Sequence, residues 1–71
     1  MDYYSIYENI RNSKGWTNYR VSKESGVPQS TLSDWKRKGS MPDISTLTRI
    51  ADALDVLLPE LLGYEVKERR A

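Results

Sequence analysis

Two short helical patterns flank Gly26 and Pro28 near the middle of the chain. Glycine takes a positive φ at low cost, so Gly26 permits a sharp turn of the backbone. The fixed φ of Pro28 and its missing N–H suit the first turn of a new helix. Thr17 is a good N-cap before the first pattern, because its hydroxyl can accept an orphan backbone N–H. These features predict helices over roughly 18–25 and 29–37, joined by a tight turn.

The second of these helices has two faces of different chemistry. Leu32 and Trp35 are three residues apart and share a face, which predicts that both are buried. The opposite face carries polar side chains, most of them short: Gln29, Ser30, Ser33, Asp34 and Arg37. Gln and Ser both donate and accept hydrogen bonds, as reading base edges in a major groove requires. A helix that is only solvated would more often carry Glu and Lys.

Length and composition exclude several kinds of site. The 71 residues suffice for one domain with a small core. The sequence contains no cysteine and no histidine, which excludes disulfides and the usual Cys/His zinc sites. Its four glycines are isolated and form no phosphate-binding loop. We therefore expect no metal, no cofactor and no small-molecule ligand.

The sequence shows neither a secretory signal nor a membrane span. Met1 is followed by Asp2 and two tyrosines rather than by basic residues and an apolar run. No apolar stretch approaches the length that crosses a bilayer. We expect a cytoplasmic protein without a membrane partner.

Charge is unevenly distributed along the chain, although the net value is only +1. Residues 11–40 contain seven Lys or Arg against two acids, a local charge of +5. Residues 41–66 contain one arginine against five acids, a local charge of −4. Positive charge around the two central helices suits a partner that carries phosphate groups, but chance clustering explains it equally well.

Three further helices are predicted from apolar spacing, over 2–14, 44–54 and 58–62. Their apolar faces consist of Tyr3, Ile6, Tyr7 and Ile10, of Ile44, Leu47, Ile50, Ala51 and Leu54, and of Leu58, Leu61 and Leu62. Asp2 and Asp43 are expected as N-caps, and Asp55 as a left-handed residue after the second of these helices. The prediction is an all-α fold, with a compact five-helix domain over 1–63 and a charged tail over 64–71.

Aromatic residues near the start of the chain are expected to serve packing rather than ligand binding. Tyr3, Tyr4 and Tyr7 are predicted to lie in the core or at its rim, with their hydroxyls in water. Trp16 is predicted to fill the space between the first two helices.

The chain resembles the phage-repressor family of helix-turn-helix proteins, the lambda repressor and Cro type that is also called XRE-like. The family pattern asks for a small residue and a glycine where Ser22 and Gly26 stand, and for apolar residues at Val21, Val27, Leu32 and Trp35. A second stretch matches the family's two C-terminal helices, through Pro42, Leu47, Ile50, Ala51, Leu54, Val56, Leu61, Leu62 and Gly63. The resemblance covers nearly the whole chain and implies a lambda-repressor-like DNA-binding domain.

In this family the second helix of the motif lies in the major groove, with its first residues at the base edges. The resemblance implies base contacts by Gln29, Ser30, Ser33 and Asp34. It implies phosphate contacts by Thr17, Asn18, Thr31, Lys36, Arg37, Lys38 and Ser40. Asn18 also matches a position that braces the leading glutamine in relatives. Asp34 can either accept from a cytosine amine or repel phosphate and help to set the helix angle. The alternative for Gln29 and Ser30 is that they are plain polar surface. The alternative for Lys36 to Lys38 is a solvated loop.

Two departures from the family pattern affect this interface. Pro28 stands where a residue with a capping side chain is usual, so the second helix of the motif lacks that cap. Lys36 stands where many members have a glutamate that pairs with an arginine at the position of Arg11. Two cations cannot form this pair, so Arg11 needs another acid, for which Glu8 is the candidate.

These features favour sequence-specific binding of double-stranded DNA by a transcriptional regulator of the repressor type. One domain reads only a half-site, so a homodimer is expected on DNA, with Leu57, Leu58 and Tyr64 as candidate contacts. An antitoxin and a protein-interaction module that keeps the fold without specific DNA binding are the alternatives. An enzyme is not expected, because no acid, Lys or Ser pair has catalytic spacing in a pocket-forming context.

Overall fold

The computed structural model describes residues 2–64, which form five helices. They are α1 (Tyr3–Ser13), α2 (Asn18–Ser25), α3 (Gln29–Lys38), α4 (Ile44–Ala53) and α5 (Leu58–Leu61). The predicted all-α fold is confirmed, and each helix lies within one residue of its predicted bounds. The predicted tail over 64–71 lies outside the described residues, except for Tyr64.

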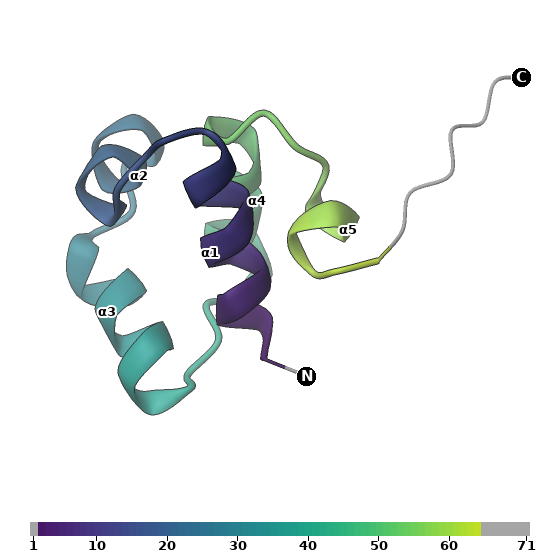
Figure 1. Ribbon diagram of the computed structural model, residues 1–71. Coiled ribbons are helices and arrows are strands. Elements are labelled where there is room, and N and C mark those ends of the chain that lie inside the picture. Colours follow the sequence, from purple (N-terminus) through teal and green to yellow (C-terminus); the bar gives the residue numbers. More distant parts are fainter. Residues whose placement is uncertain (1, 65–71) are drawn as a thin grey trace, which may run out of the picture.

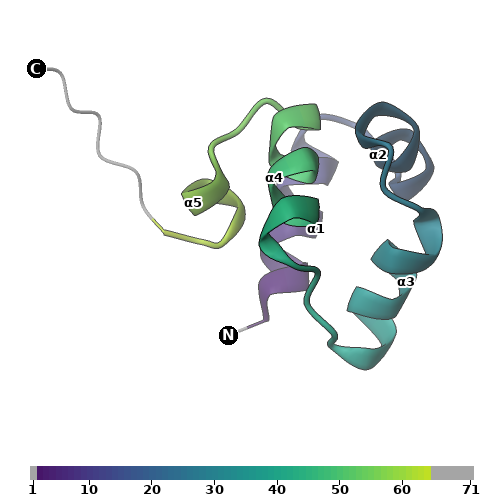
Figure 2. The same cartoon turned by 180° about the vertical axis from the view of Figure 1, so that it is seen from behind.

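The helices surround one core. In Figure 1, α2 and α3 lie on one side of α1 and α4, and α5 lies on the other; Figure 2 shows the same arrangement from behind. α2 packs against α3 and α4, and α5 packs against α1 and α4. The buried side chains are Tyr4, Tyr7, Val21, Val27, Leu32, Trp35, Leu47, Ile50, Ala51, Leu54 and Leu61. Every helix therefore contributes to the same core, as a domain of this length requires.

The helix ends follow the predicted chemistry. The hydroxyl of Thr17 accepts a hydrogen bond from the Arg20 N–H, and the carboxylates of Asp2 and Asp43 cap α1 and α4 in the same way. Gly26 ends α2 with a φ of 79°, in the left-handed region that glycine enters at low cost. The predicted left-handed Asp55 is also confirmed, with a φ of 59°.

Three predictions about packing are wrong or incomplete. Ile44 does not belong to the buried face of α4, because its side chain is 63% exposed at the first turn of the helix. The hydroxyls of Tyr4 and Tyr7 are not in water; both form hydrogen bonds with Asn18. Trp16 is only half-buried, and the guanidinium of Arg20 lies over its ring, 4.4 Å from the centroid.

The predicted dimer contacts differ in exposure. Leu57 is 56% exposed and Tyr64 is 63% exposed, whereas Leu58 is half-buried and packs against the core. Leu57 stands at the N-cap of α5 without a capping side chain, and Glu60 Oε1 accepts a hydrogen bond from its N–H at 2.9 Å. Among the described helices, none has the length and apolar character needed to cross a membrane.

Candidate nucleic-acid interface

The inner face of α3 is fixed firmly to the core. Leu32 is fully buried and Trp35 is 3% exposed, as predicted. The Trp35 ring stacks on the ring of Tyr7, with centroids 5.2 Å apart, and meets the ring of Tyr4 edge-on at 5.5 Å. Aromatic pairs at these distances add to the free energy gained by burial alone. The outer face of α3 is therefore held at a defined angle to α1.

The outer face of α3 presents most of the predicted base-contacting residues to solvent. Gln29, Ser30 and Ser33 are exposed, and Asp34 is partly exposed. The start of the helix has no side-chain cap, because Pro28 occupies the N-cap position; its carbonyl accepts the Thr31 N–H at 3.0 Å. Within residues 2–64, nothing thus covers Gln29 and Ser30 at the start of α3, which is the geometry that insertion into a groove requires.

The predicted phosphate-contacting residues differ in exposure. Exposed side chains come from Thr17, Lys36, Arg37, Lys38 and Ser40, and half-buried ones from Asn18 and Thr31. Gly39 ends α3 with a φ of 72°, so Ser40 begins the loop toward α4. Four of these residues, Thr17 and Asn18 at the start of α2 and Lys36 and Arg37 near the end of α3, line one cleft.

A cleft of about 610 Å³ opens between α1, the start of α2 and α3. It is lined by Tyr4, Glu8, Arg11, Thr17, Asn18, Ser33, Lys36 and Arg37. Three cations and one acid surround it, so a negatively charged group is its best-matched occupant. The remaining predicted residues lie outside this lining: Gln29, Ser30, Thr31, Asp34, Lys38 and Ser40.

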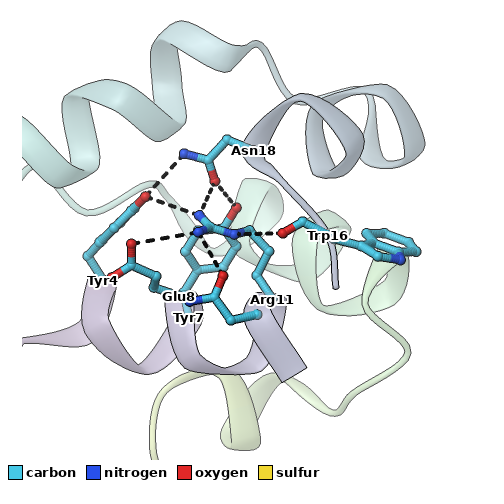
Figure 3. Close-up of polar contacts among 7 residues, drawn as sticks. Tyr4, Tyr7, Glu8, Arg11, Trp16 and Asn18 are labelled. Atoms are coloured by element: carbon cyan, nitrogen blue, oxygen red, sulfur yellow. Dashed lines mark hydrogen bonds and ion pairs between the residues drawn. The ribbon is translucent and has the colours of Figure 1, made fainter. Parts of the chain in front are cut away.

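Arg11 is one of the residues that line this cleft, and it joins α1 to the start of α2 (Figure 3). Its Nε donates to the Trp16 carbonyl at 3.1 Å, and its Nη1 donates to Asn18 Oδ1 at 2.7 Å. Glu8 lies 3.6 Å from Nη2, which confirms the expected replacement for the missing acid at Lys36. The Arg11 side chain is only 12% exposed, so most of its hydrogen-bonding capacity is used within the protein.

Asn18 was predicted to contact phosphate, but its half-buried side chain points toward α1. Its carboxamide is engaged by α1 instead of bracing Gln29: Oδ1 accepts from Tyr7 Oη at 2.5 Å, and Nδ2 donates to Tyr4 Oη at 3.1 Å. Burial raises the pKa of Tyr7 to about 12, partly opposed by the nearby Arg11. The Tyr7 hydroxyl is consequently protonated, and a hydrogen-bond donor, throughout the neutral range.

Sequence reasoning missed Tyr4 and Tyr7 as residues of this region, and of the partners of Arg11 it predicted only Glu8. The only signal was the exchange of the usual glutamate for Lys36, which showed that Arg11 must find new partners. Tyrosine at an apolar position does not reveal whether its hydroxyl faces water or a buried amide. Asn18 was identified from the resemblance, but its inward orientation was not.

Comparison with known proteins identifies one match. A helix-turn-helix family model matches residues 8–61, which include most of α1, all of α2, α3 and α4, and α5. Neither a curated protein nor a solved structure matches the chain significantly.

Proposed function

Because the chain belongs to the helix-turn-helix family of phage-repressor-like, XRE-type proteins, we propose that it regulates transcription by binding a specific double-stranded DNA site. One observation carries the proposal: Gln29, Ser30 and Ser33 are exposed on the outer face of α3. The inner face of the same helix is buried through Leu32 and Trp35. A short helix fixed in this way can enter a major groove with its first turn leading.

The leading side chains have the chemistry for base recognition. Gln29 can bond an adenine at N6 and N7 with two parallel hydrogen bonds, and Ser30 can donate to or accept from several bases. Ser33 lies one turn further on and would reach the next base pair. Asp34 Oδ1 accepts a hydrogen bond from Arg37 at 2.8 Å, and its second carboxylate oxygen would be the one to accept from a cytosine amine.

The surrounding cations and N–H groups would bind the DNA backbone. Lys36 and Arg37 line the cleft together with Thr17 and Asn18 at the start of α2, where the first N–H groups of that helix would meet a phosphate. Lys38, Ser40 and Thr31 would follow the same strand on the other side of α3. Contacts of this kind set the register of the protein and supply affinity that depends on salt.

A homodimer would double the site that one domain reads. Leu57 and Tyr64 offer exposed apolar surface near α5, and half-buried Leu58 would add little beyond support for its neighbours. Two copies related by a two-fold axis would present two α3 helices to a near-palindromic operator. Repression follows if this operator overlaps a promoter.

Selection of bound duplexes from a random pool, followed by sequencing, tests the proposal. We expect an enriched, near-palindromic site whose half-sites lie about one helical turn apart. Absence of any enriched sequence, with binding that is weak and insensitive to salt, would instead indicate a protein-interaction module. Enrichment of DNA only in the presence of a co-purifying second protein would indicate an antitoxin.

A further inference from the structure

We infer that Tyr7 is a positioning residue for DNA binding, whose hydroxyl holds Asn18 and the first turn of α2 toward the DNA backbone. This inference rests on the proposed function, because it concerns the same interface. Tyr7 is fully buried and cannot touch DNA itself. Any effect of its hydroxyl on DNA affinity must therefore be indirect, and Asn18 is the residue to which this hydroxyl donates its hydrogen bond.

The contacts of Asn18 define one orientation for its side chain (Figure 3). A guanidinium only donates hydrogen bonds, so the amide oxygen, not the nitrogen, must face Arg11. The same oxygen accepts from the Tyr7 hydroxyl, and the nitrogen donates to the Tyr4 hydroxyl. All three partners belong to α1, so Asn18 ties the start of α2 to that helix.

The position of Asn18 in α2 makes this tie relevant to phosphate binding. Asn18 is the first residue of the helix, directly after its N-cap Thr17. The Thr17 hydroxyl accepts a hydrogen bond from the Arg20 N–H. The N–H groups of the first helical residues have no backbone partner within a helix. Asn18 also lines the cleft beside Lys36 and Arg37, where a phosphate would meet those N–H groups.

Tyr7 connects α1 to α3 through a separate part of its side chain. Its ring stacks on Trp35 with an angle of 26° between the planes, whereas its hydroxyl points to Asn18. One residue thus touches α3 with its ring and α2 with its hydroxyl. Tyr7→Phe keeps the ring that supports α3 and removes one of the three α1 groups that hold Asn18.

Binding titrations of Tyr7→Phe test the inference with three readouts: affinity for the selected operator, affinity for an unrelated duplex, and the dependence of both on salt. We expect both dissociation constants to rise about three- to tenfold, the effect of one lost hydrogen bond. Base discrimination should be unchanged, because α3 keeps its support. The salt slope should also be unchanged, because no cation is removed. The matched control is Tyr3→Phe, a half-buried tyrosine on the same helix that makes none of the contacts to Asn18.

A purely structural role for the hydroxyl predicts a different result. The melting temperature of Tyr7→Phe would fall, but both dissociation constants would stay within twofold of the wild type at a temperature where both proteins are folded. That result would overturn the inference. If the wild type itself preferred no sequence, the proposed function would fail instead, and the two failures are therefore distinguishable.

A second variant, Asn18→Ala, covers the case in which Tyr7→Phe does not fold, and a double-mutant cycle is added where Tyr7→Phe folds. Asn18→Ala removes the half-buried partner of the same hydrogen bond. It should weaken binding to both duplexes to a similar extent. If Tyr7→Phe folds, the double variant should bind no more weakly than Asn18→Ala alone, because the two residues act through one contact. Fully additive losses, or unchanged binding by Asn18→Ala, would show that the contact does not position α2.

Discussion

The Asp34 carboxylate accepts a hydrogen bond from the Arg37 guanidinium at 2.8 Å, within the basic end of the helix proposed to read DNA. Lys38 Nζ lies 3.9 Å from the same oxygen, so one acid faces two of the cations predicted to bind phosphate. All three side chains are substantially exposed, and surface pairs of this kind contribute at most about 1 kcal/mol. A phosphate can therefore compete for both cations at low cost.

We predict that Asp34→Ala raises the affinity for an unrelated duplex about two- to fivefold, because the two cations lose their competitor. The measurement is a binding titration at constant salt, with Asp52→Ala, an exposed acid on α4, as the control. The affinity of Asp34→Ala for the operator then distinguishes the two possible roles of Asp34. An equal rise for the operator indicates that the carboxylate only opposes phosphate, and a loss of about 1–3 kcal/mol indicates a bond to a cytosine amine. Unchanged affinity for the unrelated duplex would contradict the prediction.

Gln29→Ala should remove discrimination at one base pair of each half-site. The expected loss is about 1–3 kcal/mol between the preferred base and its replacements, since a bidentate contact would be lost. Competition between the operator and single-base variants measures it. Asn9→Ala, an exposed polar residue that lies near α5, should leave the preference unchanged. Equal base preference in wild type and Gln29→Ala would remove this residue from the interface.

Lys38→Ala should weaken binding to every duplex alike and lower the salt slope by about one, because one phosphate contact would be lost. The slope of affinity against salt concentration is the deciding measurement. Lys23→Ala changes the same charge on the exposed surface of α2 and should have a smaller effect on the slope. An identical slope for Lys38→Ala and the wild type would show that this lysine is only solvated.

Local chemistry explains why so much of the fold was predictable. The caps at Thr17 and Asp43 and the turn at Gly26 depend on residues next to them in the chain. The buried face of α3 follows from the spacing of Leu32 and Trp35. Ile44 shows the limit of this reasoning, because the periodicity of α4 continues into a first turn that the core does not reach.

The polar network of the candidate site was not predictable, since its members are distant in sequence. Tyr7 and Asn18 are 11 residues apart and lie on different helices. Their hydrogen bond requires α1 and α2 to meet at one particular angle, which spacing along either helix does not specify. The base-contacting residues stay predictions, because their exposure is compatible with DNA binding and with plain solvation.

The raised pKa of Tyr7 predicts how stability changes at alkaline pH. An unfolded tyrosine loses its proton near pH 10, whereas Tyr7 in the folded protein does so near pH 12. Between these values the unfolded chain binds fewer protons, so the free energy of unfolding falls as pH rises. The contribution of Tyr7 to the free energy of unfolding is complete below pH 10. Above pH 10 this contribution falls by up to about 1.4 kcal/mol per pH unit. Urea unfolding at pH 8 to 11, compared with Tyr7→Phe, isolates this residue from the other groups that titrate there. The wild type should lose more stability across this range than the variant, and parallel declines would mean that burial does not hold the Tyr7 proton.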